Sequence, residues 1–359
     1  MPTARFGVEE EFLLLDEESL VPLALGDGSR ERITGSSTLG SVTPEYLTCQ
    51  LECATDPVST RADAEAQLRH LRGLLGAHAA GQSVIAAASG TPFASTHTLA
   101  VSPSPHYDDV SAHLAHITRE HAVNGLHVHV EVTDDEERIR ALNRVRGWLP
   151  VLLALTGNSP FVDGVHSGFA SWRSILIRRL PSSWCPPRFR DLADYRAHIA
   201  QLVDLQAVPD PASLAWAVRL SDRFPTVEVR VFDAQLLPED TVFAAALSRA
   251  IVLTDDRVSI GEIDGIDASL WMAARSGMDA RVVDPTTGAV ADAWQVAGRM
   301  LDATRPVLAE LGDEEFVAEH LERIRRHGTG AQRQLQAFAR AGIDGLRDLY
   351  REGTPALSP

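Results

Sequence analysis

Acidic and imidazole side chains recur at alternate positions in short segments that have the pattern of β-strands. Glu9 and Glu11 stand two residues apart, and so do His127 and His129. Because successive side chains of a strand point to opposite faces, each pair shares one face of a predicted sheet. Such pairs can bind a divalent cation, although an exposed acidic edge strand or two structural histidines would show the same spacing.

Two further segments contribute acidic side chains. Glu52 interrupts an apolar alternation, and Glu45 lies seven residues earlier, at the entrance of the same segment. Desolvating a lone carboxylate is costly, so a glutamate inside a strand pairs with a base or a metal ion unless it faces solvent. Glu228 and Arg230 also share a strand face. This pair is either an intra-strand ion pair or a metal ligand beside a guanidinium that can bind phosphate.

Together these side chains predict one carboxylate-lined site for hard cations. The candidate metal ligands are Glu9, Glu11, Glu45, Glu52, His127 and Glu228. A ligand set so rich in oxygen suits Mg²⁺ or Mn²⁺ and not a tetrahedral zinc site. Magnesium commonly bridges protein carboxylates and substrate phosphates, which points to a nucleoside triphosphate. The sequence contains neither a P-loop nor a dinucleotide-binding glycine motif.

The elements that must position these groups are strands and helices without a regular βαβ order. We expect strands over residues 5–15, 47–55, 83–89, 124–133 and 224–234. We expect helices over residues 61–80, 110–121 and 133–158, the last kinked at Pro150, and a mostly helical region from residue 238 onward. Residues 21–41 predict turns or a loop. The pattern favours an α+β fold, with a mainly antiparallel sheet backed by helices and a helical carboxy-terminal part.

The composition excludes several classes of protein. The 359 residues are 45% hydrophobic and 23% charged, as in ordinary globular chains. A formal net charge of −16 argues against nucleic acid as a partner. We find no export signal and no apolar run long enough to span a membrane. Three cysteines are too few for a disulfide framework, so we expect a cytoplasmic protein with a single domain over residues 1–359.

Seven segments resemble, in the same order, those of the type 2 glutamate-cysteine ligase family, whose members are also called carboxylate-amine ligases. They are GVEEEFLL, QLECATDP, NGLHVHV, LPVLLALTGNSPF, GFASWR, RFPTVEVRVFDAQ and HGTGAQRQ. The resemblance extends from Phe6 to about Leu349. It implies a fold similar to that of glutamine synthetase, in which a curved, mainly antiparallel sheet holds divalent ions and ATP.

The resemblance also implies a role for each matching residue. Metal ligation would fall to Glu9, Glu11, Glu45, Glu52, His127 and Glu228. His129 would face the nucleotide phosphates, and Arg230 would contact the transferred phosphoryl group. Arg173 and Arg219 would hold a substrate carboxylate or phosphate. The implied reaction uses ATP to join a carboxylate, such as glutamate, to an amine, such as cysteine, through an acyl phosphate.

The chain departs from the family pattern at Asp163, His166, Ser167 and Ala217, which predicts an altered substrate pocket beside an intact metal and ATP site. Two alternatives stay open. One is a catalytically silent relative that binds metal and nucleotide, and the other is a glutamine-synthetase-like ligase that uses ammonia. Small-molecule carboxylates and amines are the expected partners, with no nucleic acid or membrane. The sequence does not determine the oligomeric state, and a homodimer stays open.

Overall fold

The computed structural model describes residues 4–95, 99–254 and 263–356, and its centre is one antiparallel sheet. The strands of this sheet are β1 Phe6–Asp16, β2 Gly35–Ser36, β3 Ser41–Pro44, β4 Gln50–Ala54, β5 Val84–Ala87, β6 Gly125–Glu131, β9 Val218–Leu220 and β10 Thr226–Asp233. Their order is β2-β3-β4-β1-β6-β10-β9, and β5 also pairs with β1. Every pairing in the sheet is antiparallel, which confirms the predicted fold class.

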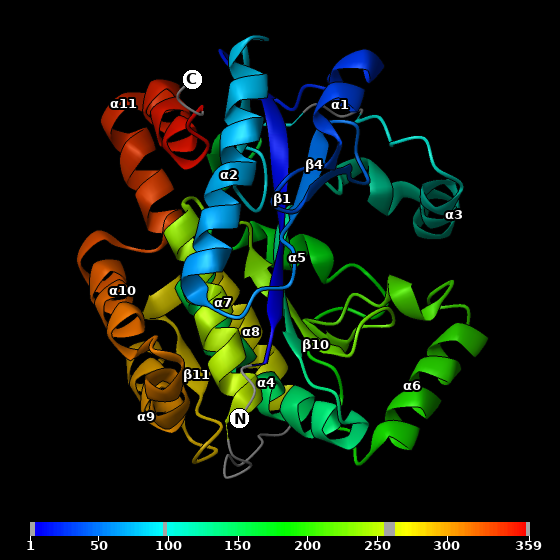
Figure 1. Ribbon diagram of the computed structural model, residues 1–359, viewed down its shortest axis with the longest axis vertical. Helices are drawn as coiled ribbons and strands as arrows, with labels where there is room; N and C mark the ends of the chain where they lie inside the picture. The colour runs from blue at the N-terminus through cyan, green and yellow to red at the C-terminus, as the bar shows by residue number, and fades with distance from the viewer. Residues whose placement is uncertain (1–3, 96–98, 255–262, 357–359) are drawn as a thin grey trace.

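Helices surround the sheet and form the carboxy-terminal part of the chain. They are α1 Asp27–Ile33, α2 Arg61–Ala80, α3 Pro105–Leu114, α4 Asp135–Thr156, α5 Trp172–Ile177, α6 Leu192–Asp204, α7 Pro238–Leu253, α8 Ile263–Ser276, α9 Ala293–Leu311, α10 Glu314–His327 and α11 Gly330–Gly353. Figure 1 shows α9, α10 and α11 stacked along one side of the molecule, with α3 and α6 on the opposite side. Within the described ranges, no helix combines the length and the apolar character needed to cross a membrane.

Local sequence signals account for the longest elements. The Thr60 side chain accepts a hydrogen bond from the Asp63 amide and caps the start of α2, and Asp134 caps α4 in the same way. In the first half of β1, Val8 and Phe12 are buried on the face that bears Glu10, whereas Glu9 and Glu11 at the alternate positions are partly exposed. This alternation holds one face of β1 against the core and directs the other face to the site.

Short elements differ from the sequence-based expectation. The region 21–41 contains α1 and β2, and residues predicted as helical contain a hairpin of β11 Arg281–Val283 and β12 Val290–Asp292. A second hairpin joins β7 Phe161–Val162 to β8 Val165–His166. The helix expected over 110–121 is instead α3 followed by a 3₁₀ segment, and the chain bends at Ala115, where φ is 50°. Strands of two or three residues, and a helix of only two turns such as α1, are too short to show a period in the sequence.

Glu10 and Arg72 form a buried ion pair that joins β1 to α2. Their side chains are 1% and 0% exposed, and Arg72 Nε donates to Glu10 Oε2 at 3.0 Å. The Arg72 guanidinium also donates to the carbonyl oxygens of Gln235, Leu236 and Gly353 at 2.9, 2.9 and 3.1 Å. The pair therefore connects β1 and α2 to the chain after β10 and to the end of α11.

We predict that Arg72→Ala lowers the free energy of unfolding by about 3–5 kcal/mol, because it leaves the Glu10 carboxylate buried without a cation. Chemical denaturation measures this loss. Arg69→Ala on the same helix is the control, because the Arg69 side chain is 50% exposed and pairs with Glu65 and Glu239 at the surface. The control should lose less than about 1 kcal/mol. Equal losses in the two variants would contradict a structural role for the buried pair.

Candidate functional site

The four strands predicted to carry chemistry are adjacent in the sheet, in the order β4-β1-β6-β10. Their registers bring the predicted ligands opposite one another as the pairs Glu11 and Glu52, Glu9 and His127, and Glu228 and His129. Side chains directly opposite in antiparallel strands lie close enough to interact. The sheet therefore gathers on one face side chains that are far apart in the sequence.

Among the described residues, three groups of side chains offer ligand atoms that lie within 4.8 Å of one another. The groups are Glu9 with His129 and Glu228, Glu9 with Glu52 and His127, and Glu11 with Glu45 and Glu52. Because Glu9 belongs to two groups and Glu52 to two, the groups form one continuous row, which we call the ligand row. It contains all six predicted metal ligands together with His129, and their binding of metal stays a prediction.

At the end of the ligand row that contains Glu11, Glu45 and Glu52, the carboxyl groups lie closer to one another than to compensating cations. Burial and the nearby Glu11 raise the pKa of Glu45 to about 8. Burial, Glu9 and Glu45 raise the pKa of Glu52 well above its ordinary value. These carboxyl groups therefore hold protons at neutral pH unless a cation replaces them. This end of the row fits a hard divalent cation for that reason.

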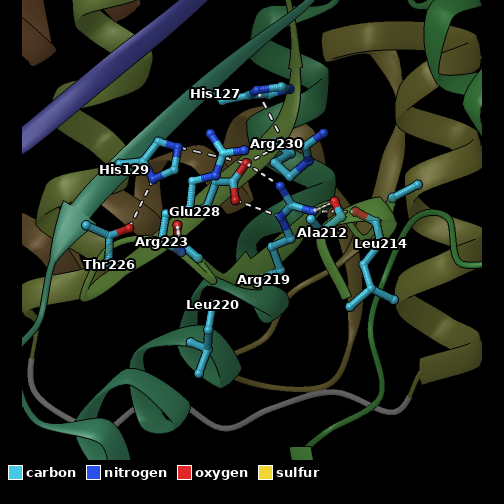
Figure 2. A network of polar contacts seen from close by, with 12 residues as sticks. His127, His129, Ala212, Leu214, Arg219, Leu220, Arg223, Thr226, Glu228 and Arg230 are labelled. Atoms are coloured by element: carbon cyan, nitrogen blue, oxygen red, sulfur yellow. Dashed lines mark hydrogen bonds and ion pairs between the residues drawn. The ribbon is translucent and has the colours of Figure 1, made fainter. Parts of the chain in front are cut away.

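The other end of the row contains guanidinium groups. Arg219 Nε donates to Glu228 Oε2 at 2.7 Å and Arg219 Nη2 to Glu228 Oε1 at 3.2 Å, and Arg230 also pairs with Glu228. Burial alone would raise the pKa of Glu228, but Arg230 and Arg219 hold it below its ordinary value. Figure 2 shows these three residues as one network with His127 and His129. Glu228 is therefore charged and oriented.

Two histidines connect the ends of the row. His127 Nδ1 lies 3.2 Å from one oxygen of Glu9, and His129 Nε2 lies 3.4 Å from the other. Burial and Arg230 lower the pKa of His127, which favours the neutral imidazole that can ligate a metal. His129 Nδ1 is 3.0 Å from Thr226 Oγ1, whereas its Nε2 is buried without a hydrogen-bond partner among the described residues. That nitrogen is available to bind a metal ion or a phosphate.

Arg173, at the start of α5, is a buried cation with weak contacts. It is 5% exposed, its Nη1 lies 3.8 Å from Asp233 Oδ1, and its Nη2 donates to the carbonyl oxygen of Arg230 at 3.5 Å. Its Nε has no hydrogen-bond partner in the described part of the chain. A Cβ atom at Gly125 would lie 2.5 Å from Arg173 Nη2, so a larger residue there would displace the guanidinium. Buried with so few contacts, the guanidinium is suited to bind an anion.

A cavity of about 280 Å³ opens at the Glu11 and Glu45 end of the ligand row, and we call it the row-end cavity. Arg173 and Arg230 also line it. Most of its remaining wall comes from α3, from α5 and from the segments after α5 and α6. Ala217 contributes to this wall. The row-end cavity is the place where a substrate can meet the ligand row.

The other three departures from the family pattern lie elsewhere. Asp163 lines a second cavity beside β7, and neither His166 nor Ser167 lines either of the two cavities. The Ser167 hydroxyl donates to the carbonyl oxygen of Pro160 and supports the loop locally. Of the four departures, Ala217 is thus the one at the row-end cavity.

Arg219 is placed differently from Arg173 and Arg230. Its Nη1 donates to the carbonyl oxygens of Ala212 and Leu214 at 2.5 and 3.0 Å, while its other nitrogens bind Glu228. With these contacts, Arg219 is better placed to orient Glu228 than to bind a substrate directly. The substrate contact that the resemblance implied for Arg219 stays a prediction.

Two residues of the site were not identified from the sequence. Thr226 contacts His129, and the Gly125 amide donates to Glu11 Oε2 at 2.6 Å. Each stands two residues before a predicted ligand, Thr226 before Glu228 and Gly125 before His127. The same alternation that placed the ligands on one face could have found Thr226, whereas the Gly125 contact uses a backbone amide and leaves no side-chain signal.

Comparison with known sequences gives a family match over almost the whole chain. Residues 5–352 match the family described as glutamate-cysteine ligase family 2. A protein of Mycobacterium sp. (strain KMS), provisionally named glutamate–cysteine ligase 2-2, is 37% identical over 360 residues, which cover 98% of each chain. A protein of Nocardia farcinica (strain IFM 10152), provisionally named glutamate–cysteine ligase 2-1, is 38% identical over 347 residues, which cover 94% of this chain and 90% of that protein.

Two solved structures share the fold. Glutamate–cysteine ligase from Francisella tularensis, in complex with AMP, has a TM-score of 0.70 and 14% identity, with 98% of this chain and 88% of that chain covered. A bifunctional glutathione synthetase from Pasteurella multocida has a TM-score of 0.71 and 16% identity, with 98% and 52% covered. At these identities the likeness extends to the fold and no further.

We predict that Glu9→Ala and Glu52→Ala each weaken Mn²⁺ binding roughly 10-fold or more, because each removes a carboxylate shared by two ligand groups. Isothermal titration calorimetry with Mn²⁺ measures the affinity. Glu131→Ala is the control, because Glu131 lies on the same sheet but pairs with Arg5 outside the row. If either variant folds and binds Mn²⁺ as tightly as the control, that glutamate is not a ligand.

Proposed function

The chain belongs to glutamate-cysteine ligase family 2 and is a ligase, and we propose that it uses ATP to join a carboxylate to an amine through an acyl phosphate. The observation that supports this proposal most strongly is the continuous ligand row that ends at a cavity containing Arg173. The row supplies a place for charged phosphates. The cavity supplies a place for the substrates that react with them.

The ligand row fits divalent cations such as Mg²⁺ or Mn²⁺. The residues that would hold them are Glu9, Glu11, Glu45, Glu52, His127 and Glu228. Cations bound there would neutralise charge on the triphosphate and on the phosphoryl group during its transfer. His129 does not line the row-end cavity, so we assign the nucleotide to the His129 end of the row and the other substrates to the opposite end.

The first step forms the acyl phosphate. An oxygen of the substrate carboxylate attacks the γ-phosphorus of ATP, the bond from that phosphorus to the bridging oxygen breaks, and ADP leaves with the electron pair. Arg230 lines the cavity and also contacts the row through Glu228, so its guanidinium can stabilise the charge on the phosphoryl oxygens. Arg173 can bind a second carboxylate of the same substrate.

The second step forms the amide. The amine nitrogen attacks the carbonyl carbon, and the carbon–oxygen bond to phosphate breaks. The incoming ammonium group loses two protons overall, one of which stays on the released phosphate and one of which goes to solvent. No covalent enzyme nucleophile is needed. The three cysteines are buried, and burial raises the pKa of Cys49 to about 11 and of Cys185 to about 12.

Two alternative functions receive less support. A catalytically silent relative would be free to lose ligands, yet all six predicted ligands lie in one row. A ligase that uses ammonia would need little space for its second substrate, whereas the row-end cavity measures about 280 Å³ and has apolar walls. An amine with a carbon substituent that contacts the apolar walls fits this cavity better than ammonia does.

The test is an assay of ADP formation over pairs of carboxylates and amines, with mass detection of the amide. We expect ADP only when Mg²⁺ or Mn²⁺ and a carboxylate are both present, and amide only when an amine is added. Turnover with ammonium alone would favour the glutamine-synthetase-like alternative. Tight ATP binding without any turnover would favour the silent relative.

We predict that Arg230→Lys lowers kcat roughly 30- to 1000-fold, equivalent to about 2–4 kcal/mol, because lysine keeps the charge but loses the planar fork. Steady-state kinetics and the thermal midpoint are measured together. Arg223→Lys is the control, because Arg223 is exposed on the loop before β10. Unchanged kcat with a lowered midpoint in Arg230→Lys would make Arg230 only the ion-pair partner of Glu228.

A further inference from the structure

The row-end cavity carries charge on one side only. Among the described residues that line it, the carboxylates are Glu11 and Glu45 of the ligand row, and the guanidinium groups are Arg173 and Arg230. Arg230 is already paired with Glu228. Arg173 has only a long ion pair, with its Nη1 3.8 Å from Asp233 Oδ1, and among the described residues no carboxylate lies within hydrogen-bonding distance of it.

Four imidazoles also line the cavity. One is His127 of the ligand row, and the other three do not change this balance. His106 and His113 are exposed, and His113 Nε2 lies 2.9 Å from the carbonyl oxygen of Ala207. Burial and the nearby arginines Arg179 and Arg173 lower the pKa of His121 to about 4, so its ring is neutral at physiological pH. Outside the ligand row, the one buried imidazole of this lining is thus neutral, and the other two are exposed to solvent.

The wall away from the ligand row is apolar and aromatic. It includes Leu114, Ile177, Leu180, Trp184 and Leu214. The Trp184 indole nitrogen already donates to the carbonyl oxygen of Ser174 at 2.7 Å, so the indole presents mainly carbon surface to a ligand. A carboxylate placed against this wall would lose its hydration without gaining a cation, which is costly.

The charges that two amino-acid substrates would bring exceed what this lining can pair. A donor such as glutamate has one reacting carboxylate, which meets the ligand row, and a second, which Arg173 can bind. An amino-acid acceptor would add a third carboxylate. Within the described lining, no further guanidinium or ammonium group remains for it.

We propose that the amine substrate carries an apolar or aromatic body and no carboxylate, as in phenethylamine, and is not an α-amino acid. This inference rests on the proposed ligase function and specifies its second substrate. The amino group attacks the acyl phosphate at the Glu11 and Glu45 end, where the carbon–nitrogen bond forms as phosphate leaves. The body of the amine packs on Ile177, Leu180 and Trp184.

The experiment compares matched acceptors that differ only by the carboxylate: phenethylamine with L-phenylalanine, tyramine with L-tyrosine, and isopentylamine with L-leucine, with L-cysteine added. Glutamate, aspartate and other dicarboxylates serve as donors with ATP and Mg²⁺, and the amide is detected by mass. We expect kcat/KM for the amine to exceed that for its amino acid by roughly 10- to 100-fold. Equal or higher values for the amino acids or cysteine overturn the inference and leave the ligase function standing. If no pair yields amide or ADP, the ligase function itself fails, and the inference fails with it.

Ile177→Arg tests the same inference from the protein side. Ile177 is partly exposed on the apolar wall, so the substitution adds a guanidinium where an acceptor carboxylate would lie. We expect the ratio of kcat/KM for L-phenylalanine to that for phenethylamine to rise roughly 10-fold. Leu205→Arg is the matched control, because Leu205 is 68% exposed just after α6 and does not line the cavity. A raised KM for ATP in Ile177→Arg but not in the control would put the nucleotide in this cavity and overturn the inference. If Ile177→Arg lowers the thermal midpoint and so disturbs the fold, the comparison of matched amines and amino acids with the wild-type protein decides the inference.

Discussion

Repulsion among the five carboxylates of the ligand row is the constraint on which the rest of the site depends. Near Glu228, histidines and arginines offset this repulsion. At the end with Glu45 and Glu52, protons bound to the carboxyl groups offset it. On the opposite face of β1, by contrast, the carboxylate of Glu10 is neutralised permanently by the buried guanidinium of Arg72. A buried guanidinium cannot leave, whereas protons can exchange for metal ions. The sheet therefore combines a fixed charge pair that stabilises the fold with an exchangeable set that can bind ligands.

The geometry of β10 gives the row its link to the substrates. The register between β10 and β6 shifts between Val229 and Phe232, so Arg230 lies in an irregular part of the strand. Bulges of this kind re-aim a side chain without ending the sheet. Arg230 contacts Glu228 and His127 on the row and also lines the cavity. One guanidinium thus lies where phosphate and carboxylate must meet.

The sequence predicted the sheet face much better than the cavity. Strand alternation alone placed Glu9 with Glu11 and His127 with His129, since a period of two is a local property of the chain. The individual roles came from the resemblance and not from periodicity. The partner of Glu10 could not be foreseen, because Arg72 is 62 residues away and meets it only through the packing of α2 on β1. The cavity wall was missed because it comes from short helices and connecting segments, which have no period to detect.

Different parts of the fold position the metal ligands and form the wall of the row-end cavity. The ligands stand on paired strands, whereas much of the cavity wall stands on α3, α5 and connecting segments that can change without moving them. Ala217 lies at the boundary: its amide donates to the carbonyl oxygen of Trp184 at 2.6 Å, and its carbonyl oxygen accepts from the Arg230 amide at 2.8 Å. Both links use the backbone, so the hydrogen bond that positions Arg230 does not depend on the side chain at this position. A change in charge at residue 217 would therefore alter what the cavity accepts and leave the ligand row intact.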